Sequence, residues 1–138
     1  MLQVGAGIQI PSNSARLLQS WGLGPFLDPY VVEPNGMTFR RWEDGNPIGY
    51  TKLVPDFRQN FGAPYYVVHR AHFHMALYKR ALELGVDVKV ASRVEQYDLD
   101  APSVELQSGE VFSADLIVAA DGELSMHRNF ECQSLICN

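Results

Sequence analysis

The sequence is short of cysteine, of long apolar runs and of clustered basic residues, and each shortage excludes a class of function. Both cysteines, Cys132 and Cys137, fall at the extreme C-terminal end, far from the four histidines. A zinc site needs about four ligands, so we expect no metal site. No apolar run approaches the roughly 20 residues that span a bilayer, and no basic segment precedes an apolar core as in a secretory signal. We expect no membrane insertion and, if Met1 is the natural start, a cytoplasmic location.

Basic residues are few and scattered along the chain. The chain has 138 residues, with 11 Lys and Arg against 16 Asp and Glu, for a net charge of −5. The basic residues are scattered, which gives no reason to expect nucleic acid or an anionic membrane as a partner. The apolar share of 46% is that of a globular chain, and the length suits one domain.

Two segments have the spacing of amphipathic helices. The first runs from Ala15 to Trp21, where Ser12 or Asn13 is expected to cap its start and Gly22 to end it. The second contains Phe73, Leu77, Ala81 and Leu84 at intervals of three and four residues, and ends at Gly85. The proline- and glycine-rich stretches 24–36 and 47–64 are expected to be irregular, apart from a short strand near 48–53.

The remaining segments favour β-strands, so the chain is expected to be an α/β domain. Residues 116–120 form an unbroken apolar run, typical of a strand buried on both faces of a parallel sheet. The other expected strands are 4–10, 37–42, 65–68, 86–90, 94–99, 104–106 and 111–112.

Gly5-Ala6-Gly7 is only part of a dinucleotide-binding motif. The full pattern, G-x-G-x-x-G between a strand and a helix, requires a third glycine for close helix packing. Here that position is Ile10, and Pro11 follows it. A glycine-permitted tight backbone segment is the preferred interpretation, and a nucleotide-binding protein that uses Gly5-Ala6-Gly7 directly is an alternative.

Three blocks together point to a family. The first is Val4-Gly5-Ala6-Gly7-Ile8-Gln9-Ile10-Pro11-x-Asn13 with Arg16-Leu17-Leu18 and Trp21-Gly22-Leu23. The second is Val68-His69-Arg70-Ala71-His72-Phe73-His74-Met75-Ala76-Leu77. The third is Ala114-Asp115-Leu116-Ile117-Val118-Ala119-Ala120-Asp121-Gly122 with Ser125 and Arg128. In this order and spacing they resemble the salicylate-hydroxylase-like FAD-dependent aromatic-ring monooxygenases. The last two resemble the family's "HRxDLHxxL" block and its DG motif.

The resemblance implies an FAD site. Its cofactor-binding residues would be Gly5, Ala6, Gly7, Gln9, Arg70, Asp121 and Gly122, and no catalytic residue is identified. An arginine suits such a site, because its permanently charged fork holds phosphate or ribose oxygens. One departure is His72, where the family has an aspartate, which puts the local capping in doubt. We interpret His69, His72 and His74 as ordinary polar residues of a helix start.

The resemblance also implies a fold and an organisation. The expected fold is a partial Rossmann-like FAD-binding domain of the para-hydroxybenzoate-hydroxylase type, with a small β-rich insertion and without the first βαβ unit. Residues 1–128 would form this partial domain, and 129–138 would be an unmatched tail.

The intact family uses NAD(P)H to reduce FAD and hydroxylates an aromatic or polyketide-like small molecule. For this chain alone we expect weak or no FAD binding and no turnover. The second alternative is a non-catalytic α/β interaction module descended from such an enzyme. The oligomeric state stays open.

Overall fold

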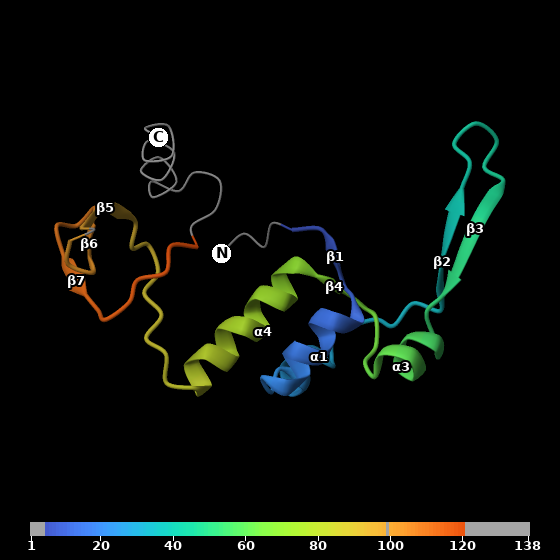
Figure 1. Ribbon diagram of the computed structural model, residues 1–138, viewed down its shortest axis with the longest axis horizontal. Helices are drawn as coiled ribbons and strands as arrows, with labels where there is room; N and C mark the ends of the chain where they lie inside the picture. Colours follow the sequence, from blue (N-terminus) through green and yellow to red (C-terminus); the bar gives the residue numbers. More distant parts are fainter. Residues whose placement is uncertain (1–4, 99, 121–138) are drawn as a thin grey trace. The chain divides into compact units, whose positions relative to one another are not determined.

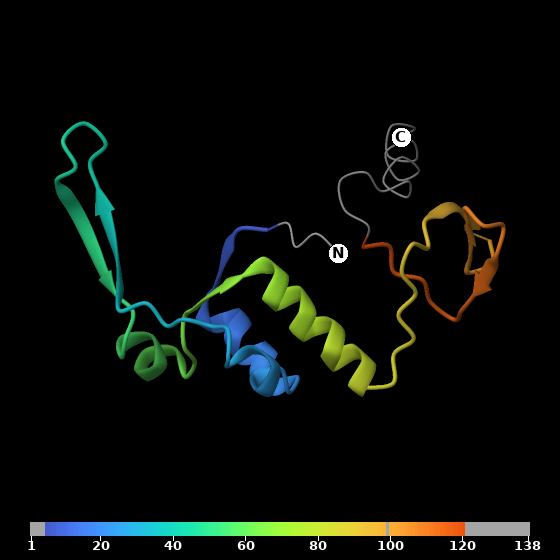
Figure 2. The ribbon, with the colours of Figure 1, turned by 180° about the vertical axis from the view of Figure 1, so that it is seen from behind.

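The computed structural model describes residues 5–98 and 100–120, which fall into two compact units. The first unit extends to Val88 and the second begins at Lys89. Figures 1 and 2 show the elements of each unit from opposite sides. No helix in the described part of the chain is long and apolar enough to cross a membrane.

The first unit is built on an antiparallel ribbon of two strands that are distant in sequence. Strand β1 (Gly7–Ile10) pairs with β4 (Tyr66–His69), in a register that sets Gly7 opposite His69 and Ile10 opposite Tyr66. An isolated bridge from Val32 to Val67 lies on the other edge of β4. The expected strands at 4–10 and 65–68 are therefore present, and they are each other's partners.

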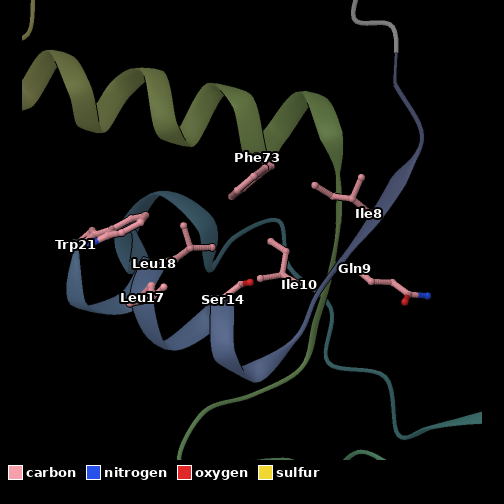
Figure 3. A pocket seen from close by; sticks show the side chains of 8 residues that line it. All are labelled: Ile8, Gln9, Ile10, Ser14, Leu17, Leu18, Trp21 and Phe73. Carbon is pink, nitrogen blue, oxygen red and sulfur yellow. The ribbon is translucent and has the colours of Figure 1, made fainter. Parts of the chain in front are cut away.

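Two helices cover one face of this ribbon. They are α1 (Ser12–Ser20) and α4 (Arg70–Glu83), and Figure 3 shows both beside β1. Side chains alternate along a strand, so Ile8 and Ile10 of β1 face the helices. The buried core comprises Ile10, Ala15, Leu18, Leu23, Leu27, Ala63, Tyr66, Val68 and Ala76.

Glycines end both helices, as expected. Gly22 follows α1 with φ of 77°, and Gly85 follows α4 with φ of 81°, a conformation that costs glycine little. The expected side-chain cap of α1 was wrong. Its N-cap is Pro11, which provides no side-chain hydrogen bond, and the buried Ser12 donates instead to the Ala63 carbonyl at 2.8 Å. Asn13 lies inside the helix, where its Oδ1 accepts from the Ser14 backbone N–H at 2.8 Å.

The segment between α1 and β4 is more regular than its prolines and glycines suggested. It contains α2 (Gly24–Leu27) and α3 (Asp56–Phe61), both inside stretches expected to be irregular. Between them β2 (Gly36–Arg40) and β3 (Pro47–Lys52) form an antiparallel hairpin. Prolines at the first turn of α2 and just before α3 are compatible with helix starts, where no backbone N–H is required.

The second unit contains a three-stranded antiparallel sheet in the order β5-β6-β7. The strands are β5 (Val94–Asp98), β6 (Ser103–Leu106) and β7 (Val111–Ser113). These confirm the three β candidates expected between 94 and 112. Lys89 places its ammonium 4.8 Å from the centre of the Phe112 ring, within the range of a cation–π contact.

Two expected strands were wrong. Residues 86–90 and 116–120 are irregular, and Leu116 and Val118 are 76% and 77% exposed. An apolar run becomes a buried strand only where neighbouring strands satisfy its backbone and cover its side chains. Among the described residues, no strand pairs with either run, and every pairing is antiparallel. The α/β class holds, but the described part shows no parallel sheet.

Candidate functional site

The β1–β4 ribbon joins two of the sequence blocks into one site. The Arg70 backbone N–H, at the start of α4, donates to the Ala6 carbonyl at 3.0 Å. A methyl group placed on Gly5 would lie 3.1 Å from Cβ of Arg70 and 3.4 Å from Cε1 of His69. A side chain at position 5 would therefore be tight against the residue that begins α4, which would have to shift by a few tenths of an ångström to admit it.

Gly7 has a different environment from Gly5. Nothing lies within 4 Å of a methyl group placed on it, and its φ is not positive. Glycine here is required neither by the backbone conformation nor by a neighbouring atom of the described chain. The missing side chain leaves the β1 backbone open to a close approach from outside, one of the uses to which glycine is put at ligand sites.

The start of α4 is capped by a histidine. Nδ1 of His69 accepts a hydrogen bond from the Ala71 backbone N–H at 3.2 Å. His72 stacks against Tyr30, with ring centroids 4.3 Å apart, and its ring lies 5.7 Å from that of His69. The departure from the family aspartate at position 72 therefore leaves the helix capped. His69 acts as the cap, and His72 packs against a tyrosine.

Gln9 lies on the ribbon face that α1 and α4 do not cover. Figure 3 shows its amide directed away from Ile10 and Leu18. The amide is held by one contact, since the Tyr65 hydroxyl donates to Oε1 of Gln9 at 2.5 Å. Tyr65 is itself buried and lies edge-on to Phe57, with ring centroids 5.6 Å apart.

An apolar groove of about 310 Å³ lies on the helix-covered side of β1. The residues around it are Ile8, Gln9, Ile10, Ser14, Leu17, Leu18, Trp21 and Phe73. Figure 3 shows their side chains, of which that of Gln9 points away from the groove. Leu17 and Trp21 are 50% and 55% exposed. None of the lining residues is ionisable, so the groove offers an apolar surface and no acid or base for catalysis.

Charge at the site comes from Arg70. Its side chain is exposed, and among the described residues its guanidinium forms no ion pair or hydrogen bond. Arg58 and Glu33 form an ion pair away from this site. There the Glu33 carboxylate accepts hydrogen bonds from Arg58 and raises the pKa of that guanidinium. No three His, Cys, Asp or Glu side chains in the described ranges are placed to hold a metal ion.

Five of the seven residues expected at a cofactor site are thus neighbours in the first unit: Gly5, Ala6, Gly7, Gln9 and Arg70. The other two, Asp121 and Gly122, lie outside the described residues, as do Ser125 and Arg128.

Comparison with known proteins gives consistent relatives, although no protein-family model matches the chain. A 3-amino-4-hydroxybenzoate 2-monooxygenase of Streptomyces cremeus is 37% identical over 132 residues, which cover 93% of this chain and 32% of the relative. An FAD-dependent monooxygenase of Beauveria bassiana is 35% identical, over 91% of this chain and 30% of the relative. A 3-hydroxybenzoate 6-hydroxylase of Polaromonas naphthalenivorans is 31% identical.

The chain is a homologue of the FAD-dependent aromatic-ring monooxygenases. It spans about a third of the length of the curated relatives that it matches, for instance 32% of the Streptomyces cremeus protein. The resemblance seen in the sequence blocks is confirmed.

Solved structures share the fold. The tetrameric form of 2-methyl-3-hydroxypyridine-5-carboxylic acid oxygenase matches with a TM-score of 0.72 and 32% identity, over 86% of this chain and 29% of that one. Klebsiella pneumoniae HpxO complexed with FAD and uric acid has a TM-score of 0.69 at 22% identity, which supports the fold alone.

Two features of this monooxygenase homologue were missed from the sequence. Tyr65 was expected only as a strand residue, and His69 only as a polar residue of the helix start. The β1–β4 register was needed to bring Tyr65 beside Gln9, and no local signal shows it. The cap of His69 had a weak signal, because it directly precedes a strongly periodic helix, but histidine is not among the preferred N-cap residues.

Proposed function

We propose that this chain provides part of an FAD-binding surface in a flavoprotein monooxygenase. One observation carries the proposal. The pairing of β1 with β4 joins the glycine block to Arg70 across more than 60 residues of sequence, and relatives of this segment are named FAD-dependent monooxygenases. Nothing in the local sequence of the glycine block or of the Arg70 block requires these two segments to lie side by side.

The residues at this site fit a flavin nucleotide. Arg70 supplies a cation with no partner in the described chain, which suits a phosphate or a ribose oxygen. Gly5 and Gly7 keep the backbone free of side chains on the same stretch, and Gln9 adds a neutral amide. Asp121 and Gly122 are proposed to complete the contact with FAD, by the resemblance of their block to the DG motif.

For the whole protein we propose NAD(P)H-dependent hydroxylation of an aromatic or polyketide-like small molecule. Curated relatives are named for 3-amino-4-hydroxybenzoate and 3-hydroxybenzoate. FAD, when bound, supplies the redox chemistry with oxygen, whereas the protein binds and orients it. The described residues contribute binding and orientation, and no catalytic acid or base is assigned to them.

The finer fold is likewise a proposal. By its similarity to these monooxygenases, residues 1–128 would be part of a Rossmann-like FAD-binding domain, and 129–138 an unmatched tail. In this proposal the first βαβ unit of the family is missing, and the sequence contains no G-x-G-x-x-G pattern. Gly7 opens β1 and lies several residues before α1, which argues against Gly5-Ala6-Gly7 being that turn. A cytoplasmic location is proposed with the same family.

The test is a titration of the ¹⁵N-labelled 138-residue chain with FAD, followed by backbone amide shifts. We expect weak, saturable binding, with shifts concentrated at Gly5, Ala6, Gly7 and Arg70. Arg70→Ala should weaken binding about ten-fold, the ~1.4 kcal/mol expected for an exposed charged contact. Arg16→Ala, at another exposed arginine, is the matched control and should bind as the parent chain does.

Gly7→Ala extends this test, because a methyl group at Gly7 meets no atom of the described chain within 4 Å. The variant should fold normally and bind FAD less well. Saturable shifts with NAD but not FAD would favour the nucleotide-binding alternative. Shifts with neither ligand would reject the proposal and favour a non-catalytic interaction module.

A further inference from the structure

Tyr65 is the buried partner of an exposed amide. Its side chain is 8% exposed, it lies edge-on to Phe57 of α3, and its hydroxyl donates to Oε1 of Gln9 at 2.5 Å. The two residues are 56 positions apart in sequence and meet only because β1 pairs with β4. Because Tyr65 is buried and packed against Phe57, its hydroxyl has little freedom to move and can restrict the conformation of the Gln9 side chain.

The alternation of the ribbon explains why this pair faces outward. Gln9 is opposite Val67 in the register, so Gln9, Val67 and the diagonal neighbour Tyr65 share one face. Ile10 and Tyr66 share the other face, where they join the core. Gly7 lies on the same face as Gln9 and adds no side chain, which leaves the surface beside the amide open.

The direction of the hydrogen bond determines what Gln9 can offer. A glutamine amide has an oxygen that accepts and a nitrogen that donates two hydrogens. Because Tyr65 donates to the oxygen, the nitrogen of Gln9 is the end left for a ligand, and no described residue accepts from it. A ligand atom that meets this nitrogen must be an acceptor, such as a carbonyl oxygen or an unprotonated ring nitrogen.

We propose that Tyr65 is a positioning residue that fixes the Gln9 amide so that its nitrogen donates to an acceptor atom of the flavin. The inference rests on the proposed FAD site and adds to it which partner donates in one hydrogen bond: the Gln9 nitrogen donates and the flavin accepts. Tyr65 itself does not touch the ligand, and its effect on binding passes through Gln9.

A double-mutant cycle in the 138-residue chain tests this role. FAD affinity is measured by ¹⁵N shifts for the parent, Gln9→Ala, Tyr65→Phe and the double variant. Each single change should weaken binding by about three- to ten-fold, the range of a single hydrogen bond. The double variant should bind no more weakly than Gln9→Ala, since Tyr65 has nothing left to position. Equal losses from Tyr65→Phe in both backgrounds would overturn the inference.

Tyr66→Phe is the matched control. Tyr66 is the adjacent tyrosine on the opposite face, where its hydroxyl accepts from Nε2 of Gln19 at 3.3 Å. Removing this hydroxyl should leave FAD affinity unchanged. If Tyr66→Phe weakens binding as much as Tyr65→Phe does, the effect is a general loss of packing and the inference is wrong.

Two further readouts remain valid if Tyr65→Phe reduces stability. In the absence of FAD, the side-chain ¹⁵N–H₂ signal of Gln9 should shift on Tyr65→Phe; an unchanged signal overturns the inference. Gln9→Glu keeps an oxygen for Tyr65 but removes the donor, so it should fold well and bind FAD at least ten-fold more weakly. Full affinity in Gln9→Glu also overturns the inference, whereas a parent chain that does not bind FAD overturns the proposed function and the inference with it.

Discussion

Ser12 connects two distant parts of the first unit, and its removal should be costly. Its hydroxyl donates to the Ala63 carbonyl at 2.8 Å, across 51 residues of sequence. Ser12 is 4% exposed and Ala63 is 1% exposed. The bond therefore ties the first turn of α1 to the segment that leads into β4, in a place where water cannot replace it.

The expected magnitude follows from what Ser12→Ala leaves behind. The variant removes the donor, and the Ala63 carbonyl stays buried without a partner, which costs about 1–3 kcal/mol. A domain of this size has only about 5–15 kcal/mol of net stability. For a unit of 60–100 residues, each kcal/mol lowers Tm by roughly 4–8 °C, so a loss near the middle of the range lowers Tm by roughly 8–16 °C.

Thermal and urea unfolding followed by far-UV circular dichroism measure the effect. Ser20→Ala is the matched control, because the Ser20 hydroxyl bonds only within its own helix, to the Leu17 carbonyl, in an exposed place. It should change the free energy of unfolding by less than about 0.5 kcal/mol. If the two variants are equally stable, Ser12 does not tie α1 to the β4 segment and the reasoning fails.

Two other changes give smaller expected effects. His69→Ala removes the side-chain cap of α4 and should lower the free energy of unfolding by about 1 kcal/mol; His69→Asn should restore most of it, and His74→Ala, at an exposed position of the same helix, should have little effect in urea unfolding. Arg58→Met removes the ion pair with Glu33, whose side chains are 50% and 29% exposed, so it should cost under about 1 kcal/mol. The raised pKa of Arg58 is a stabilising shift that is lost only above the ordinary arginine pKa. This effect of Arg58→Met should therefore be the same at pH 6 and pH 8, and a marked difference would contradict the assignment.

The two longer helices, α1 and α4, were predictable because their signals are local, whereas the short helices α2 and α3 were not predicted. Apolar residues recur at three and four residues in α4, and Gly22 and Gly85 end their helices by adopting positive φ. Such signals need only a few neighbouring residues. The prediction of a side-chain cap for α1 failed for the opposite reason. Ser12 has the right residue type for a cap, but a carbonyl 51 residues away is its partner, and no local pattern contains that carbonyl.

The strands themselves were mostly predictable from local β-prone runs, but their pairing was predictable only where partners are near in sequence. The pairing of β1 with the distant β4 was not predicted. β5, β6 and β7 follow one another and pair in that order, so each short β-prone run finds its neighbour. The run 116–120 has a stronger apolar signal than any of them, yet it is irregular and exposed. Composition shows that a segment can be buried in a sheet, whereas the presence of a paired neighbour decides whether it is.

The candidate site depends on a single register. With Gly7 opposite His69, β1 places Ile8 and Ile10 on the side of α1 and α4, and Gly7 and Gln9 on the open side. The period of a strand is two residues, so a slip of one residue would exchange these faces, bury the Gln9 amide and expose Ile10. Burial of Ile10 in the core therefore fixes the outward direction of Gln9 as well. The core residues that stabilise the ribbon therefore also determine which way its polar side chains point. A substitution at Ile10 that loosened the register should weaken ligand binding as well as stability.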